Sequence, residues 1–176
     1  MKLVILSLLV LNFTSYSMEQ LELNHKLFQA CLGPKKVDKE IANLTEISNL
    51  LEQKADINAL CTTGPLGKQI TPLIQTLYGC CTGKANRIAF LLNKHANVEA
   101  VDEDNDNALT HALRQYVTAP LDQQGEYFKI IKSLLLSGSR VTDDSLTLID
   151  QFIDHTIEHP HNSNLRKLLI SSRSTI

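Results

Sequence analysis

LLNKHANVE (residues 91–99) has two close counterparts in the chain, LLEQKADIN at 50–58 and LLLSGSRVT at 134–142. Each copy has two leucines, three residues suited to a helix end, a small residue, a polar one and a β-branched one. The copies lie 41 and 43 residues apart, and apolar residues precede them at helical spacing, as at Ile47 and Ile88. One such helix cannot bury its apolar face alone, so the repetition predicts an all-α protein built from stacked helix pairs.

A second pattern interleaves with the first. TPLIQTL (residues 71–77) matches NALTHAL (residues 107–113), 36 residues further on. Thr71 and Asn107 are good N-cap residues, and Pro72 falls at the first helical position, where its missing N–H costs nothing. The expected unit is therefore a first helix, a connection, a second helix and an extended loop.

These residues resemble the ankyrin repeat. Thr71-Pro72-Leu73 matches the start of its first helix, and HANVEA with Asp102 (residues 95–102) matches its turn and finger. His95 and Asn105 stand where the family has glycine, and Gly138 supplies the helix-ending glycine of the third copy. The resemblance covers roughly residues 20–172. It implies a helical-repeat solenoid of about four ankyrin-like helix–turn–helix units with extended fingers, approximately residues 20–60, 61–101, 102–143 and 144–176.

The chain also departs from the family. Its offsets exceed the ankyrin period of about 33 residues, so we expect long loops. The candidates are the finger Leu60–Ile70 and the connections Gly33–Glu40, Gly79–Ala85, Val117–Gly125 and His155–Asn164. Tetratricopeptide repeats would want a tryptophan, and the chain has none. Generic helical repeats remain an alternative.

The first 17 residues predict a secretory signal peptide rather than part of the fold. Lys2 precedes an apolar run from Leu3 to Leu11, and Ser15 and Ser17 form a small-x-small pattern. The run is too short for the roughly 20 residues that span a bilayer. We expect cleavage between Ser17 and Met18, export to a periplasm or the medium, and a mature domain of residues 18–176 that does not enter a membrane.

Composition narrows the class of partner. With 17 basic and 19 acidic residues the net charge is −2, which argues against a general nucleic-acid binder.

The resemblance implies a non-catalytic module, expected to be monomeric and free of cofactors, that binds a protein through its fingers and concave face. The acidic finger Asp102–Asp106 favours a partner that is basic there. The predicted contact residues are Leu66, Lys68, Gln69, Gln75, Glu103, Asp104, Asp106, His111 and Gln115.

The alternative is a metal- or thiol-dependent enzyme on a helical scaffold. An EF-hand loop starting at Asp102 would need Gly and Glu where Asn107 and Leu113 stand, so those acids predict a solvated finger tip. His155, His159 and His161 could hold a metal, but we expect them to lie in an exposed polar loop between paired helices.

The cysteines leave two further alternatives open. Cys61 could bridge to Cys80 or Cys81, or these three and Cys31 could all be free thiols. The sequence Asn43-Leu44-Thr45 is a glycosylation sequon. Its Thr45 would serve equally well as a helix cap.

Overall fold

The computed structural model describes residues 2–34, 39–62, 68–79, 83–155 and 162–173, with side chains from residue 17 to residue 151 and from residue 164 to residue 173 outside those gaps. The described chain is all-α, as predicted. Its helices are α1 (Lys2–Cys31), α2 (Glu40–Glu52), α3 (Pro72–Tyr78), α4 (Lys84–Asn93), α5 (Ala108–Thr118), α6 (Leu121–Leu136), α7 (Asp143–His155) and α8 (Asn162–Arg173).

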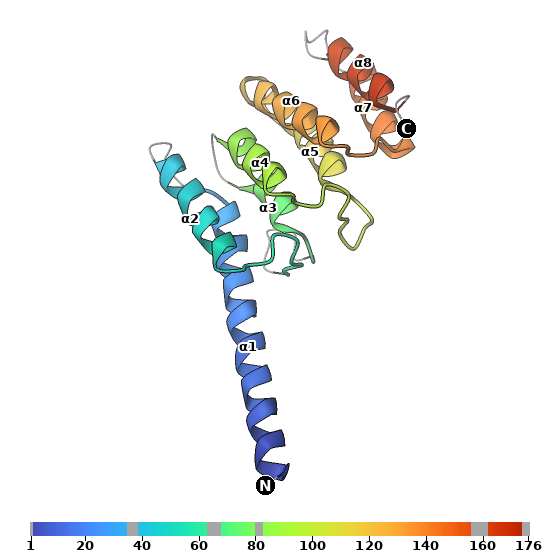
Figure 1. The fold of residues 1–176 in the computed structure, drawn as a ribbon. Helices are drawn as coiled ribbons and strands as arrows, with labels where there is room; N and C mark the ends of the chain where they lie inside the picture. The colour runs from blue at the N-terminus through green and yellow to red at the C-terminus, as the bar shows by residue number, and fades with distance from the viewer. Residues whose placement is uncertain (1, 35–38, 63–67, 80–82, 156–161, 174–176) are drawn as a thin grey trace.

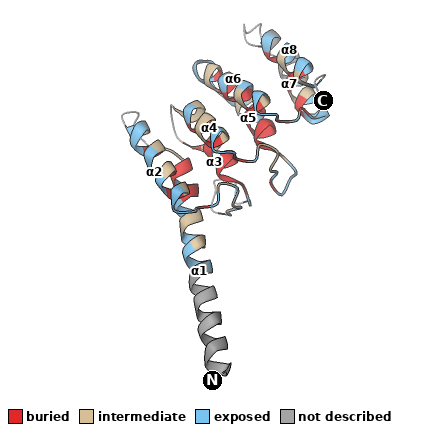
Figure 2. Ribbon diagram, in the orientation of Figure 1, coloured by how far each residue is buried: buried red, intermediate tan, exposed pale blue. Residues whose placement is uncertain are grey.

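The helices form two layers. Figure 1 shows four successive pairs from α1 and α2 to α7 and α8, with the start of α1 projecting away from the rest. The first helices of the pairs pack on one another, α1 on α3, α3 on α5 and α5 on α7, while α4, α6 and α8 form contacts in the other layer. The layer of first helices carries a larger share of the buried apolar residues than the other layer does, and the red segments of α3 and α5 stand out in Figure 2. Every residue from 71 to 77 is buried.

The turn that follows α2, α4 and α6 has the same geometry each time. Lys54, His95 and Gly138 occupy equivalent positions in the three sequence copies, and all have positive φ, at 77°, 64° and 90°. The N–H of each donates to the carbonyl three residues back, and the N–H of the next residue donates to the carbonyl five residues back, all at 3.0 Å. This is the Schellman arrangement that satisfies the last carbonyls of a helix, and two of the three copies form it without glycine.

A side-chain hydrogen bond joins each turn to the element before it. In every case an amide or carboxylate oxygen accepts a backbone N–H from the residue that starts the next loop, which fixes the register between neighbouring units. The bonds are Asn24 Oδ1 with Asp56 N (2.7 Å), Asn58 Oδ1 with Asn97 N (2.7 Å) and Glu99 Oε1 with Arg140 N (2.8 Å).

The predicted N-caps at Thr71 and Asn107 are confirmed. Thr71 Oγ1 accepts the Ile74 N–H at 3.3 Å, and Asn107 Oδ1 accepts the Thr110 N–H at 3.0 Å. Each cap follows a loop closed at its base by an isolated antiparallel bridge. We call residues 60–70 the first finger and residues 101–107 the second finger. The bridges pair Cys61 with Ile70 and Val101 with Asn107.

Two expectations about loops and caps are wrong. The connection expected over Val117–Gly125 shrinks to Ala119 and Pro120, because α6 begins at Leu121. Proline lacks only the N–H, which the start of a helix does not use, and the Pro120 carbonyl accepts the N–H groups of Gln123 and Gln124 at 2.9 and 3.2 Å. Pro120 therefore starts α6 instead of breaking it. Thr45 is not a cap, because α2 begins at Glu40 and the Thr45 hydroxyl donates to the Ile41 carbonyl inside that helix.

Helix α1 runs without a break through the expected cleavage point at Ser17. Gln20 links α1 to the turn after α2, since its Nε2 donates to the Lys54 carbonyl at 2.8 Å. Further along, Leu27 and Phe28 are fully buried. A search of the described helices finds none with the length and hydrophobicity needed to cross a bilayer.

Candidate functional site

The second finger is folded around the side chain of Asp102. One oxygen of this carboxylate, Oδ1, accepts the N–H groups of Asp104 and Asp106 at 2.9 and 3.0 Å. Asn105 supplies the left-handed residue at φ 65° that the tight loop needs. Asp102 is buried, so the expectation that all of these acids face water is wrong at this position.

The other oxygen of Asp102 reaches His111 on α5. His111 Nε2 lies 3.1 Å from Asp102 Oδ2, and His111 Nδ1 lies 2.6 Å from the hydroxyl of Tyr78 at the end of α3. A carboxylate accepts only, so we assign the proton to Nε2, which leaves Nδ1 to accept the phenol proton. Three elements, α3, the second finger and α5, therefore meet at one buried imidazole.

Burial sets the protonation of this chain of groups. It lowers the pKa of His111, and the charges of Asp102 and Asp106 oppose that change without reversing it. Burial likewise raises the pKa of Tyr78, so its phenol stays protonated at neutral pH. A protonated phenol is a poor nucleophile, and the arrangement is better suited to holding the finger than to chemistry.

The remaining acids of the second finger also have partners within the chain. Both oxygens of Asp106 contact the guanidinium of Arg114, with Nη2 3.2 Å from Oδ1. Lys68 of the first finger pairs with Asp104, and the backbone N–H of Gln69 donates to Glu103 Oε1 at 3.3 Å. Two of the four carboxylates of this finger, Asp104 and Asp106, are thus paired with cations of the chain itself, which weakens the expectation of a basic partner at those two positions.

Asp102, Asp106 and His111 place possible metal-binding atoms within 4.8 Å of one another. The residues do not fit a metal well as they stand. His111 presents a protonated Nε2 to Asp102, and Arg114 already holds Asp106 in a two-pronged ion pair. A cation would have to displace Arg114 and switch the histidine tautomer.

The predicted contact residues divide into three groups. Gln69, Glu103 and Asp104 are exposed, while Lys68, Asp106 and Gln115 are partly buried. Leu66 lies outside the described residues. Gln75 and His111, also predicted as contacts, are buried, at 0% and 3% exposure, so neither side chain presents surface to a partner in this structure. Both lie on first helices whose neighbours on either side cover them.

The cysteines and histidines on which the enzyme alternative depends are mostly buried or lie outside the described residues. Burial raises the pKa of the Cys31 thiol to about 12 and also raises the pKa of Cys61, which makes both poor nucleophiles. Both are free thiols. Cys80, Cys81, His159, His161 and the side chain of His155 lie outside the described residues. Of the sequon, Asn43 is buried and donates to the Ala30 carbonyl at 2.9 Å.

Sequence reasoning missed Tyr78, Arg114 and the buried role of Asp102. A signal was present for two of them. Arg114 lies three residues after His111 on α5, so the two share a helix face. Tyr78 occupies the position equivalent to Arg114 one unit earlier. The buried role of Asp102 was obscured by its neighbours, since an acid followed by three others within four residues is expected to face water. Comparison with models of known protein families finds no match for this chain, and comparison with curated proteins finds none either.

Proposed function

We propose that this chain is an exported, non-catalytic protein of the ankyrin-repeat type that binds a protein partner through its fingers and concave face as a monomer. The observation that carries the proposal is the Schellman turn formed three times, at Lys54, His95 and Gly138. Each copy follows a second helix and is joined to the preceding unit, or in the first copy to α1, by a side-chain hydrogen bond, as expected of stacked repeats.

The fingers support a binding role because they are held rigidly. The second finger is fixed from within by Asp102 and from behind by His111 and Arg114, and the first finger is tied to it through Lys68. A surface that is already ordered loses little conformational entropy on association. Of the predicted contact residues on it, Gln69, Glu103 and Asp104 are exposed.

The Lys2 cation, the apolar run behind it and the serines at 15 and 17 support export. N-terminal sequencing of the protein recovered from the periplasm or medium of an expressing bacterium tests this part. A first residue of Met18 is expected. Recovery of the intact chain in the cytosol alone would contradict it.

Binding is tested with a photo-crosslinking amino acid at Glu103 on the second finger, compared with the same group at Lys132, which is exposed on α6 in the other layer. We expect one protein to be captured from the exported compartment at Glu103 and not at Lys132. Equal capture at the two positions, or conversion of a small molecule by the purified chain, would argue against a finger-directed binding module.

A further inference from the structure

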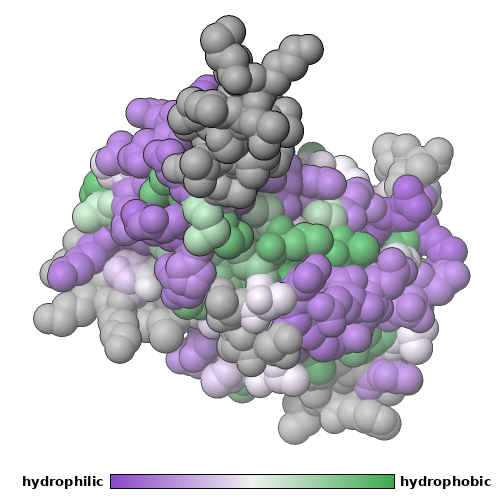
Figure 3. Space-filling model, turned by 90° about the horizontal axis from the view of Figure 1, so that it is seen from below, coloured by the Kyte–Doolittle hydropathy of each residue, from purple (hydrophilic) through white to green (hydrophobic). Residues whose placement is uncertain are grey.

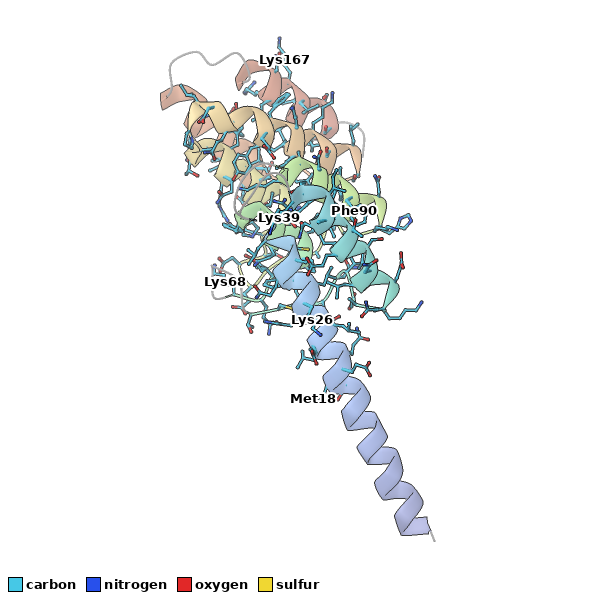
Figure 4. The ribbon with its side chains drawn as sticks, turned by 90° about the vertical axis from the view of Figure 1, so that its left-hand side faces the viewer. Met18, Lys26, Lys39, Lys68, Phe90 and Lys167 are labelled. Atoms are coloured by element: carbon cyan, nitrogen blue, oxygen red, sulfur yellow. The ribbon has the colours of Figure 1, made fainter. Side chains whose placement is uncertain are left out.

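A groove of about 770 Å³ lies where α1 leaves the body of the molecule, beside the first finger. Met18, Leu21, Glu22 and His25 line one wall, at the three- and four-residue spacing of one helix face, and Leu60 with Cys61 lines the other. Figure 4 shows Met18 on α1 where the helix emerges from the body. The wall on α1 spans two turns of helix, about 10 Å.

Several exposed apolar side chains cluster at this groove. Met18, Leu21 and Leu60 are 65%, 61% and 54% exposed, and all three line it. Figure 3, seen from below, shows hydrophobic residues gathered beside the emerging start of α1. The other large exposed apolar residues in the described chain are scattered, with Ile41 on α2 and with Leu121 and Leu136 at opposite ends of α6. Clustered apolar exposure marks interaction sites, whereas scattered residues do not.

The charges at the groove are acidic. Glu19 and Glu22 line it from α1, and Lys26, the ion-pair partner of Glu22, stands outside the lining. The one lysine of the first finger that the structure describes, Lys68, is paired with Asp104 on the opposite flank of that finger. An occupant therefore meets apolar surface in the middle and carboxylates at the edge.

This charge pattern decides between two occupants. A second copy of the chain placed symmetrically on the groove would bring a second set of the carboxylates of Glu19 and Glu22 into the same interface, with no lysine or arginine in the described lining to offset them, which is unfavourable. A helix with one apolar face and lysine or arginine beside it would bury Leu21 and Leu60 and pair with both glutamates. Helix-in-groove binding of this kind uses side chains spaced three and four residues apart, which matches the spacing of the α1 wall.

We propose that the groove between α1 and the first finger binds a basic amphipathic helix of a partner protein. The inference rests on the proposed function, since it names a partner class and a surface for the same binding module. It places the apolar contacts on Met18, Leu21 and Leu60 and the ionic ones on Glu19 and Glu22.

The test uses two synthetic 18-residue helices with the same leucine face, one carrying lysines on the polar face and the other glutamates. The protein is the chain as expressed, with its N-terminus read by mass spectrometry. Binding is measured by fluorescence anisotropy, and occupancy of the groove by the rate at which iodoacetamide alkylates Cys61, located by peptide mapping. We expect the lysine helix to bind and to slow alkylation of Cys61, and the glutamate helix to do neither.

Three variants sharpen the result. Leu21→Glu should weaken binding of the lysine helix by about tenfold or more, as loss of a central apolar contact does. Leu136→Glu, the same change at a leucine of α6 that is 80% exposed against 61% for Leu21, should leave binding unaltered. Reversal of both charges with Glu19→Lys and Glu22→Lys should transfer preference to the glutamate helix. Circular dichroism verifies that each variant is folded, and both substituted leucines are exposed, so folding should survive.

The inference is overturned if Leu21→Glu and Leu136→Glu bind the lysine helix equally, if charge reversal does not change the preference, or if Cys61 reacts at the same rate with and without the helix. Crosslinking at Glu103 uses a different residue and a different ligand. Capture there with no effect at Leu21 therefore removes the groove and leaves the proposed function standing, whereas binding at the groove without capture at Glu103 removes the second finger as the contact surface.

Discussion

The molecule contains two buried polar clusters that are satisfied to different degrees. In the second finger, Asp102 accepts two backbone N–H groups and one imidazole, and His111 has a partner on each ring nitrogen. Near the connections between paired helices, Arg87 of α4 is fully buried and meets Glu40 of α2 through a single contact of 2.5 Å. Within the described chain, Nε and Nη2 of Arg87 and Oε1 of Glu40 have no hydrogen-bond partner.

Two glycines make room for the Arg87 and Glu40 pair. A Cβ at Gly33 would collide with Cζ of Arg87, and a Cβ at Gly83 would lie 2.6 Å from Cδ of Glu40. Both residues also have positive φ, at 76° and 91°. The ion pair is thus held in a space that side chains at these two positions would fill.

The difference teaches that burial alone does not make a polar group stabilising. A charge with several donors and acceptors around it is solvated by the protein, whereas a charge with one partner depends on that partner completely. The finger cluster should therefore tolerate the loss of one member better than the Arg87 and Glu40 pair does.

The largest effect is expected from Glu40→Ala. It leaves the Arg87 guanidinium buried without its counter-charge, which should lower the free energy of unfolding by about 3 to 5 kcal/mol. Urea unfolding followed by circular dichroism measures it. Adding Arg87→Met to Glu40→Ala removes the stranded charge and should restore most of the loss. A double variant no more stable than Glu40→Ala would show that the pair itself, and not the stranded charge, is what matters.

His111→Ala should cost less, about 2 kcal/mol. Asp102 keeps both backbone donors after the substitution, and the half-buried Tyr78 hydroxyl can turn to water, so only one carboxylate oxygen loses its partner. The same urea unfolding measurement applies. If His111→Ala destabilises the chain more than Glu40→Ala does, the contrast between the two clusters is reversed.

The two clusters should also respond to pH in opposite directions. The pKa of His111 is lowered by burial from 6.5, so the unfolded chain binds the proton more readily and stability falls as pH drops below about 6.5. The pKa of Glu40 is raised by burial from 4.5, against the opposing charge of Arg87, so stability falls as pH rises above that value. Each slope is at most about 1.4 kcal/mol per pH unit for one proton.

Unfolding free energies measured from pH 4 to pH 8 separate the two contributions. His111→Gln should remove the part that is lost on acidification and leave the other, while Glu40→Gln should do the opposite. The assignment of either slope fails if its own substitution leaves it intact.

Much of the fold was predictable because local chemistry determines it. The Leu-Leu pairs mark the ends of α2, α4 and α6, and Thr71 and Asn107 start α3 and α5 as caps do wherever they occur. The connection before α6 was predicted too long because Pro120 breaks a helix in its interior but can precede one. Local patterns alone do not distinguish those two uses.

The buried clusters were not predictable, because each depends on residues far apart in the sequence. Arg87 lies one turn before Leu91 on the apolar face of α4, and nothing around it indicates that Glu40, 47 residues earlier, supplies its counter-charge. His111 and Gln75 were predicted to be exposed because the family pattern places contacts on first helices. The extent to which neighbouring helices cover those positions depends on packing that one unit does not reveal.

The smallest effect is expected at the Schellman turns, which both clusters leave untouched. His95 adopts φ 64° with a full side chain, whereas Gly138 adopts φ 90° with none, and a Cβ at Gly138 would meet no atom within 4 Å. His95→Gly should stabilise the chain by about 0.5 to 1 kcal/mol, since the left-handed strain exceeds the extra freedom glycine gives the unfolded state. Gly138→Ala should destabilise it by a similar amount. Thermal unfolding of both variants measures the two changes in stability, which should have opposite signs. If both changes have the same sign, the two turns are not energetically equivalent although they form the same hydrogen bonds.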